Sequence, residues 1–235
     1  MKIVFILLIT TLTLFAYDAS NVTSDKCSRE LKRVAYEVCF SDEFKSPLYS
    51  KYNAIVEQVL ITKERYTNFS SDKELPELLR VNDKDYYKAP YDKGHLFPMF
   101  MADWSESTAR EANLFSNIVP QNSYLNRQGA WRQSERISYN ILKKNNFIVE
   151  VSGVYFNVED EIDIVIGNNV YVPDKVFKAI IVPSIKKYIV FIYDNRAVPY
   201  SMWFNPISPK DLEEMTGVKL NIPDDYVQFT KEELE

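Results

Sequence analysis

The chain of 235 residues contains a single histidine, His95. Imidazole is the side chain whose unperturbed pKa lies nearest to neutrality, so general-base chemistry run by a histidine has one place to occur. His95 lies in the run 91–98 (YDKGHLFP), and two more polar runs follow it, 115–121 (FSNIVPQ) and 126–135 (NRQGAWRQSE). These three runs, in this order, hold side chains suited to hydrolysis.

Hydrolysis of a phosphodiester needs a base for the attacking water, a cation to stabilise the charge that builds on the phosphate, and help for the leaving oxygen. His95 can supply the base. A divalent cation can supply the rest, and we expect Mg²⁺, which prefers oxygen ligands and keeps several waters, with Mn²⁺ as second choice. Asn126 offers an amide oxygen to such an ion, and the Glu135 carboxylate can orient its waters.

The three runs resemble the DNA/RNA non-specific endonucleases, the ββα-metal or His-Me finger group that includes secreted bacterial nucleases and mitochondrial endonuclease G. The family signature Asp-Arg-Gly-His corresponds to 92–95, where the chain reads DKGH. The block Ser-Asn-Ile-x-Pro-Gln is intact at 116–121, and the block Leu-Asn…Trp-x-x-x-Glu spans 125–135. The resemblance covers most of the chain, from Tyr36 to Val218.

The resemblance implies an endonuclease that cleaves DNA and RNA without sequence specificity and leaves 5′-phosphate and 3′-hydroxyl ends. In that mechanism His95 activates the water, Asn126 is the only direct protein ligand of the metal, and Glu135 acts on the metal's water shell. Asn117 is a further catalytic candidate near the site. The substrate-binding candidates are cations in or near the runs, namely Arg65, Lys93, Arg132 and Arg136.

The chain departs from the family pattern at three places. Lys93 stands where the family has arginine, so a point charge replaces a bidentate fork. Asn126 and Glu135 are nine residues apart instead of eight. On a regular helix a separation of eight leaves roughly 80° between two side chains and nine leaves about 180°. A π-bulge near Gln128 and Gly129 would absorb the additional residue and return both groups to one face.

A third departure concerns the arginine that the family carries one turn after the glutamate. Tyr139 occupies that position here, and Arg132 or Arg136 can substitute for the missing cation. Taken alone, an asparagine such as Asn126 is more often a helix cap than a metal ligand. Two other functions therefore stay open: a catalytically degenerate member that binds nucleic acid without cutting it, and a hydrolase of a different phosphodiester. The order of the three runs favours the nuclease.

The composition indicates one domain, because 235 residues at 46% hydrophobic content can build one ample core and no linker divides the chain. Apolar runs rich in β-branched and aromatic residues predict strands, and 126–144 is the best candidate for a long helix. Strands on both sides of one long helix predict an α+β fold with an antiparallel central sheet, a ββα-metal motif and a long helix that carries the metal ligand. The predicted strands are 34–40, 52–61, 147–156, 163–166, 169–172, 176–182, 188–193 and 200–204.

Residues 1–19 read as a signal peptide, with a basic start, an apolar stretch and small residues near Ala16 and Ala19. The stretch holds roughly 13 apolar or threonine residues, fewer than the ~20 that a membrane anchor needs. We therefore expect a nuclease domain at 20–235, secreted or periplasmic and free of the membrane once the peptide is removed. Cys27 and Cys39 fit such a compartment as a disulfide.

The formal net charge is −5, which does not favour tight binding to nucleic acid. The excess lies in an acidic C-terminal segment, since residues 207–235 hold eight acidic and three basic side chains. The rest of the chain is balanced, and an enzyme that releases its substrate needs only local cations near the scissile phosphate. The sequence specifies neither an inhibitor protein nor an oligomeric state.

Overall fold

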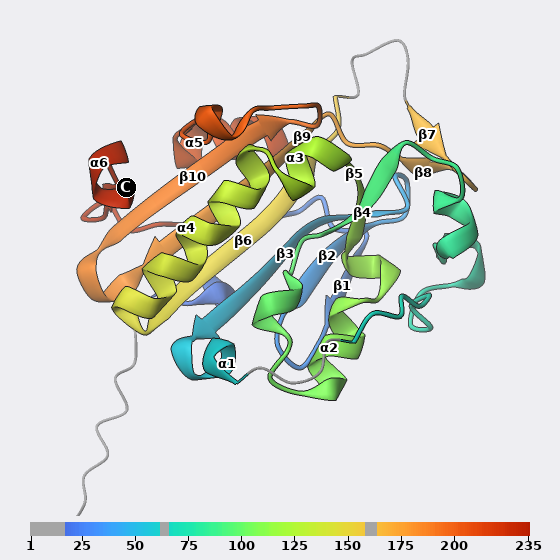
Figure 1. The fold of residues 1–235 in the computed structure, drawn as a ribbon, viewed down its shortest axis with the longest axis horizontal. Helices are drawn as coiled ribbons and strands as arrows, with labels where there is room; N and C mark the ends of the chain where they lie inside the picture. Colours follow the sequence, from blue (N-terminus) through green and yellow to red (C-terminus); the bar gives the residue numbers. More distant parts are fainter. Residues whose placement is uncertain (1–16, 62–65, 158–163) are drawn as a thin grey trace, which may run out of the picture.

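A computed structural model describes residues 17–61, 66–157 and 164–235. A seven-stranded sheet lies at its centre, and the helix α4 (Ala130–Asn145) runs across one face of it, as Figure 1 shows. The spatial order of the strands is β1-β2-β3-β6-β9-β10-β11, and every pairing is antiparallel except that of β10 with β11. The α+β class with an antiparallel central sheet is therefore confirmed.

The strands of the sheet are β1 (Arg29–Lys32), β2 (Glu37–Ser41), β3 (Ser46–Ile55), β6 (Phe147–Tyr155), β9 (Lys175–Val182), β10 (Lys187–Asp194) and β11 (Val227–Gln228). Two short pairs lie outside it, β4 (Tyr91–His95) with β5 (Ile118–Asn122) and β7 (Val165–Ile166) with β8 (Val170–Tyr171). The remaining helices are α1 (Val56–Leu60), α2 (Glu106–Ala112), α3 (Ser123–Arg127), α5 (Pro209–Thr216) and α6 (Lys231–Leu234).

Each face of the sheet has its own hydrophobic core because side chains alternate along every strand. On β6, Ile148 and Val154 join the core beneath α4, whereas Val149 and Val151 join the core on the opposite face. The core beneath α4 includes side chains of one stripe of that helix, Trp131, Ile137, Ile141 and Leu142. The core on the opposite face is covered by the N-terminal segment and α5 through Tyr17, Val22, Leu212 and Leu220.

The ββα-metal motif is formed by β4, β5 and the helices that follow β5. In the register of the pair, His95 lies opposite Ile118 and Gly94 opposite Val119. A Cβ atom on Gly94 would lie 2.3 Å from Oε1 of Gln121, so only glycine permits this close approach of the two strands. The pairing brings the signature at 92–95 and the block at 116–121 into direct contact.

Several predicted strands differ from the observed elements. Ser46 and Pro47, which lie between the predicted strands 34–40 and 52–61, begin β3. Residues 56–60 form the short helix α1 instead of extending a strand, and 200–204 includes a 3-10 turn at Tyr200–Met202. Short apolar runs of this kind suit a strand or a buried helical turn equally well, so periodicity does not decide between them.

The residues at the end of the predicted leader contact the rest of the described chain. The first sixteen residues of the predicted signal peptide lie outside the described residues, but Tyr17 is 1% exposed and its hydroxyl donates a hydrogen bond to the carbonyl of Leu220. The packed domain thus includes 17–19, which the prediction had assigned to the leader. The Cys27–Cys39 disulfide is present. No helix within the described ranges is long and apolar enough to cross a membrane.

Candidate active site

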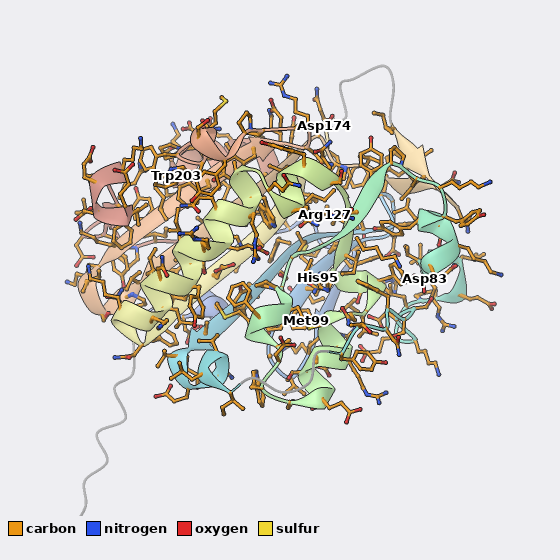
Figure 2. All side chains as sticks on the ribbon, in the orientation of Figure 1. Asp83, His95, Met99, Arg127, Asp174 and Trp203 are labelled. Atoms are coloured by element: carbon orange, nitrogen blue, oxygen red, sulfur yellow. A yellow bond between two sulfur atoms is a disulfide. The ribbon has the colours of Figure 1, made fainter. Side chains whose placement is uncertain are left out.

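One cavity brings together the three residues to which the sequence assigns the chemistry. It has a volume of about 810 Å³ and lies where β4 meets α3 and the first turns of α4. His95, Asn126 and Glu135 all line it. Figure 2 shows His95 on the same side of the sheet as Met99 and Arg127, which also line the cavity. Residues forty positions apart in the chain therefore share one site.

The His95 ring is oriented by Asn113, a residue that the sequence analysis did not identify. Nε2 of His95 lies 2.8 Å from Oδ1 of Asn113, whose Nδ2 donates to the carbonyl of Tyr66 at 3.0 Å. The second contact fixes which end of the amide faces His95, since only Nδ2 can donate. Nε2 therefore carries the proton, and in the neutral ring Nδ1 holds the lone pair that can accept one.

Asn126 is held by Asp92, the first residue of the signature. The amide nitrogen of Asn126 donates to Oδ2 of Asp92 at 3.0 Å, which leaves the amide oxygen as the ligand atom of this side chain. The backbone is fixed as well, because α3 begins at a cap in which Asn122 accepts bonds from the amides of Tyr124 and Leu125. Asp92 thus positions Asn126 from across the cavity.

The additional residue between Asn126 and Glu135 is taken up by an interruption of the helix. The amides of Gln128 and Gly129 both donate to the carbonyl of Tyr124, at 2.9 and 2.7 Å, and α4 then restarts with the amide of Ala130 bonded to the carbonyl of Val198 at 3.2 Å. The bond from the Gly129 amide spans five residues, as in the predicted π-bulge, but the helix ends there instead of continuing through the bulge. Asn126 lies on the short helix α3, not on the long helix.

Gly129 is required at this interruption. A Cβ atom there would lie 2.4 Å from the carbonyl oxygen of Val198 and 2.9 Å from the Cα atom of Leu125. Backbone atoms cannot move away as a flexible side chain can, so the close approach needs glycine. The interruption changes the direction of the chain, and both Asn126 and Glu135 face the cavity although their spacing forbids this on a regular helix.

Glu135 lies at the inner edge of the cavity, with 12% of its side chain exposed. Burial raises the pKa of its carboxyl group, and the positive charges of Lys178 and Arg132 oppose that rise. Nη1 of Arg132 donates to Oε2 of Glu135 at 3.1 Å. Arg132 therefore lines the cavity and also pairs directly with the Glu135 carboxylate.

Asn117, the further catalytic candidate, does not line the cavity. It is fully buried. Its Oδ1 accepts from the amide of Phe97 at 2.8 Å, and its Nδ2 donates to the carbonyls of Phe97 and Ala112 at 3.0 and 2.9 Å. These three bonds join the Asn117 side-chain amide to backbone atoms of Phe97 and Ala112. Asn117 therefore connects the segment that follows His95 to the end of α2.

The predicted substrate-binding cations occupy different positions. Lys93 lines the cavity, but its ammonium group pairs with Asp83 and lies 4.5 Å from the ring centre of Phe69. Arg136 lines a smaller hollow of about 210 Å³ beside the main cavity, together with Arg132. Arg65 lies outside the described residues. A cation that the prediction omitted, Arg127, lines the cavity with 68% of its side chain exposed.

The donor set fits a hard divalent cation that keeps most of its waters. The cavity offers the amide oxygen of Asn126 and the carboxylate of Glu135, both oxygen ligands. Among the described residues there is no cluster of three or more His, Cys, Asp or Glu side chains that could hold a metal. A soft or fully protein-coordinated ion is therefore a poor match, whereas a largely hydrated ion with one amide ligand is a good one.

Sequence similarity to known proteins points to one family. The profile of the DNA/RNA non-specific endonuclease family matches residues 17–226. Similar proteins include "Nuclease EXOG, mitochondrial" of Xenopus laevis, 27% identical over 174 residues (66% of this chain, 47% of that protein), and the same-named protein of Danio rerio, 35% identical over 85 residues (36% and 24%). "Mitochondrial nuclease" of Saccharomyces cerevisiae is 30% identical over 123 residues (48% and 37%). The chain thus spans less than half the length of these relatives.

A solved structure supports the fold. The crystal structure of the EndoG/EndoGI complex matches with a TM-score of 0.76 at 18% identity, over 85% of this chain and 89% of that chain. The expected secreted or periplasmic location is contradicted, because five curated relatives are named as mitochondrial nucleases and so point to mitochondria. An apolar N-terminal stretch and a disulfide are each compatible with more than one compartment, and this is why the sequence pattern misled.

Proposed function

The chain belongs to the DNA/RNA non-specific endonuclease family, and from this premise we propose that it is a Mg²⁺-dependent endonuclease that hydrolyses DNA and RNA without sequence specificity and leaves 5′-phosphate ends. One observation carries the proposal. The only histidine of the chain shares a cavity with the Asn126 amide and the Glu135 carboxylate. A base, a metal ligand and a carboxylate for the metal's waters are thereby brought together.

The residues of the chain divide the chemistry among them. Nδ1 of His95 takes a proton from the attacking water, while Asn113 keeps the other ring nitrogen protonated. The water oxygen bonds to phosphorus as the bond from phosphorus to the 3′-oxygen breaks. The 3′-oxygen takes a proton from a solvent water and leaves as a hydroxyl, and the proton on His95 returns to solvent. Asn126 and Glu135 would hold the cation, which when bound supplies charge stabilisation to the phosphate and the leaving oxygen. Asp92 keeps the Asn126 amide oriented.

The test is cleavage of plasmid DNA and of a structureless RNA by the purified chain with Mg²⁺, with EDTA as the metal-free arm. We expect both polymers to be cut, EDTA to stop the reaction, and His95→Ala to lower the rate by about 10²-fold or more. Lys210→Ala, an exposed change on α5 away from the cavity, is the control and should cut like the unchanged protein. Metal-independent cleavage, or full activity of His95→Ala, would reject the mechanism.

The same cleavage assay distinguishes this nuclease from the second candidate, a degenerate family member that binds nucleic acid without cutting it. Lys93 favours that candidate, because its charge is paired with Asp83 and is not free for a phosphate. A protein of this kind would retard DNA in a gel with Mg²⁺ present and leave it intact. End-labelling of the products tests for 5′-phosphate ends. A product with a 5′-phosphate accepts a labelled phosphate only after a phosphatase has removed the unlabelled one.

A further inference from the structure

We propose that Arg127 is a substrate-binding residue of this site, and that its guanidinium group binds a backbone phosphate of the polynucleotide beside Asn126. The proposal rests on the proposed nuclease function and adds a contact to it. Arg127 is the last residue of α3 and follows Asn126 directly in the chain. It lines the same cavity as His95, and both labelled residues lie near the middle of the view in Figure 2.

The guanidinium group is held in place but retains donors. Nε of Arg127 donates to Oδ2 of Asp92 at 2.6 Å, and Nη2 donates to Oδ1 of the same carboxylate. The carboxylate is 10% exposed, whereas the arginine side chain is 68% exposed. A guanidinium group carries five N–H donors, so the bidentate contact leaves the others for a second anion at the solvent side. An arginine fixed along one edge loses little freedom when it binds a phosphate along another.

All three described cations that line the cavity pair with a carboxylate, and the three pairs differ in what the carboxylate does. Lys93 pairs with Asp83, which Figure 2 shows at the side of the molecule away from Arg127. Arg132 pairs with Glu135, a carboxylate that the mechanism needs for the metal's waters. Arg127 pairs with Asp92, which also accepts a hydrogen bond from Asn126. The Asp92 carboxylate would therefore keep a partner even if a bound phosphate weakened its contact with Arg127. Arg127 is thus the cation best placed to reach a phosphate without disturbing the metal ligands.

The helix interruption explains why an arginine can stand here. The segment between Asn126 and Gly129 contains the residue by which the chain exceeds the family spacing, and α3 ends at Arg127 so that its side chain leaves the helix at the cavity rim. A planar fork matches a phosphate in a way that a lysine point charge does not. Arg127, at the end of α3, can therefore bind a phosphate through two hydrogen bonds, which Lys93 on β4 cannot do.

The test compares Arg127→Gln and Arg127→Lys with a matched control, Arg29→Gln. Arg29 makes the same bidentate contact, with Asp42, on β1 and away from the cavity. For Arg127→Gln we expect KM for DNA to rise about tenfold, with kcat and the half-saturating Mg²⁺ concentration unchanged. The slope of log KM against log salt should become shallower by about one, as expected for one lost phosphate contact. Arg127→Lys should keep the slope and show a smaller rise in KM.

The alternative role is that Arg127 only braces Asp92 and, through it, Asn126. In that case Arg127→Gln would raise the half-saturating Mg²⁺ concentration and lower kcat, with KM and the salt slope unchanged, and the proposal would be overturned. Equal behaviour of Arg127→Gln and Arg29→Gln would overturn it too. Binding of a labelled oligonucleotide to His95→Ala, with and without Arg127→Gln, checks that KM reports affinity. If the unchanged protein cuts no nucleic acid, the proposed function itself fails, which is a distinct result.

Discussion

At the scale of single residues, the chemistry depends on which nitrogen of His95 carries the proton. Asn113 decides this, because its amide oxygen accepts from Nε2 and its amide nitrogen is tied to the carbonyl of Tyr66. Without that acceptor the ring can rotate and exchange tautomers, and the lone pair no longer points consistently at the water. Asn113 does not touch the substrate in this arrangement, so it is a positioning residue.

We predict that Asn113→Leu lowers kcat by about a hundredfold, since it removes most of what an oriented general base contributes. KM should stay nearly constant, because the phosphate contacts are untouched. Asn113→Asp keeps an acceptor for Nε2 and should retain more activity than Asn113→Leu. Steady-state kinetics on DNA, with a thermal melt to confirm folding, measures both. Equal losses in the two variants would mean that Asn113 acts only through packing.

Glu135 gives a prediction on pH. Burial raises its pKa in the folded protein, so the carboxylate is less favourable there than in the unfolded chain. The stability that the protonated group contributes is present below the unfolded pKa and is lost as pH rises through the folded pKa. We therefore expect Glu135→Gln to be inactive but more stable than the unchanged protein at pH 7, with the difference vanishing near pH 4. Urea unfolding at the two pH values measures it, and a variant less stable at pH 7 would contradict the prediction.

At the scale of secondary-structure elements, α4 is anchored by a buried polar network as well as by its apolar stripe. Lys178 of β9 and Glu150 of β6 form an ion pair in which both side chains are 0% exposed. Ser138 of α4 donates to Glu150, and the Lys178 ammonium group lies 4.7 Å from the ring centre of Trp131. The network ties the helix turn after Glu135 to two strands. The position of Glu135 therefore depends on the sheet beneath it.

Removing one partner of this pair leaves an uncompensated buried charge, whereas removing both leaves no buried charge and only the neutral hydroxyls of Ser138 and Ser152. We predict that Lys178→Met destabilises the fold by about 3–5 kcal/mol and that Lys178→Met combined with Glu150→Leu recovers most of that loss. Urea unfolding of the single and double variants gives both values. A double variant as unstable as the single one would show that the network, and not the lone charge, stabilises α4.

At the scale of the whole molecule, the two ends of the described chain support each other. Tyr17 packs in the core opposite α4 and bonds to Leu220, and the amide of Thr23 bonds to the carbonyl of Lys219. The C-terminal segment, although acidic, is thus part of the fold that supports the sheet from behind. The cavity lies on the α4 side of the sheet, and this contact between the two ends lies on the other side.

We predict that a chain beginning at Ser20, the boundary expected from the sequence, is less stable than one beginning at Tyr17 by about 3 kcal/mol, the cost of removing a buried aromatic side chain. The comparison is made by thermal and urea unfolding of the two purified chains. Tyr17→Phe in the longer chain isolates the hydrogen bond to Leu220 and should cost less. Equal stability of the two chains would place the start of the domain after Tyr17.

The sequence by itself determined the family and led to the proposed chemistry, because residue types and the order of three short runs are local properties of the chain. It identified His95, Asn126 and Glu135, which the cavity brings together, and it predicted the α+β class from the strand and helix patterns. It also located the irregularity between Asn126 and Glu135, since a nine-residue spacing does not fit one helix face.

Only the tertiary structure decided which partner each of these groups has. Asn113 meets His95 across 18 residues and Asp92 meets Asn126 across 34, and such contacts depend on how strands and helices pack. For the same reason Asn117, which the motif offered as catalytic, is buried and does not line the cavity, and Arg127 came to stand at the cavity. Local spacing fixes what a side chain can do, but packing over long separations fixes what it is next to.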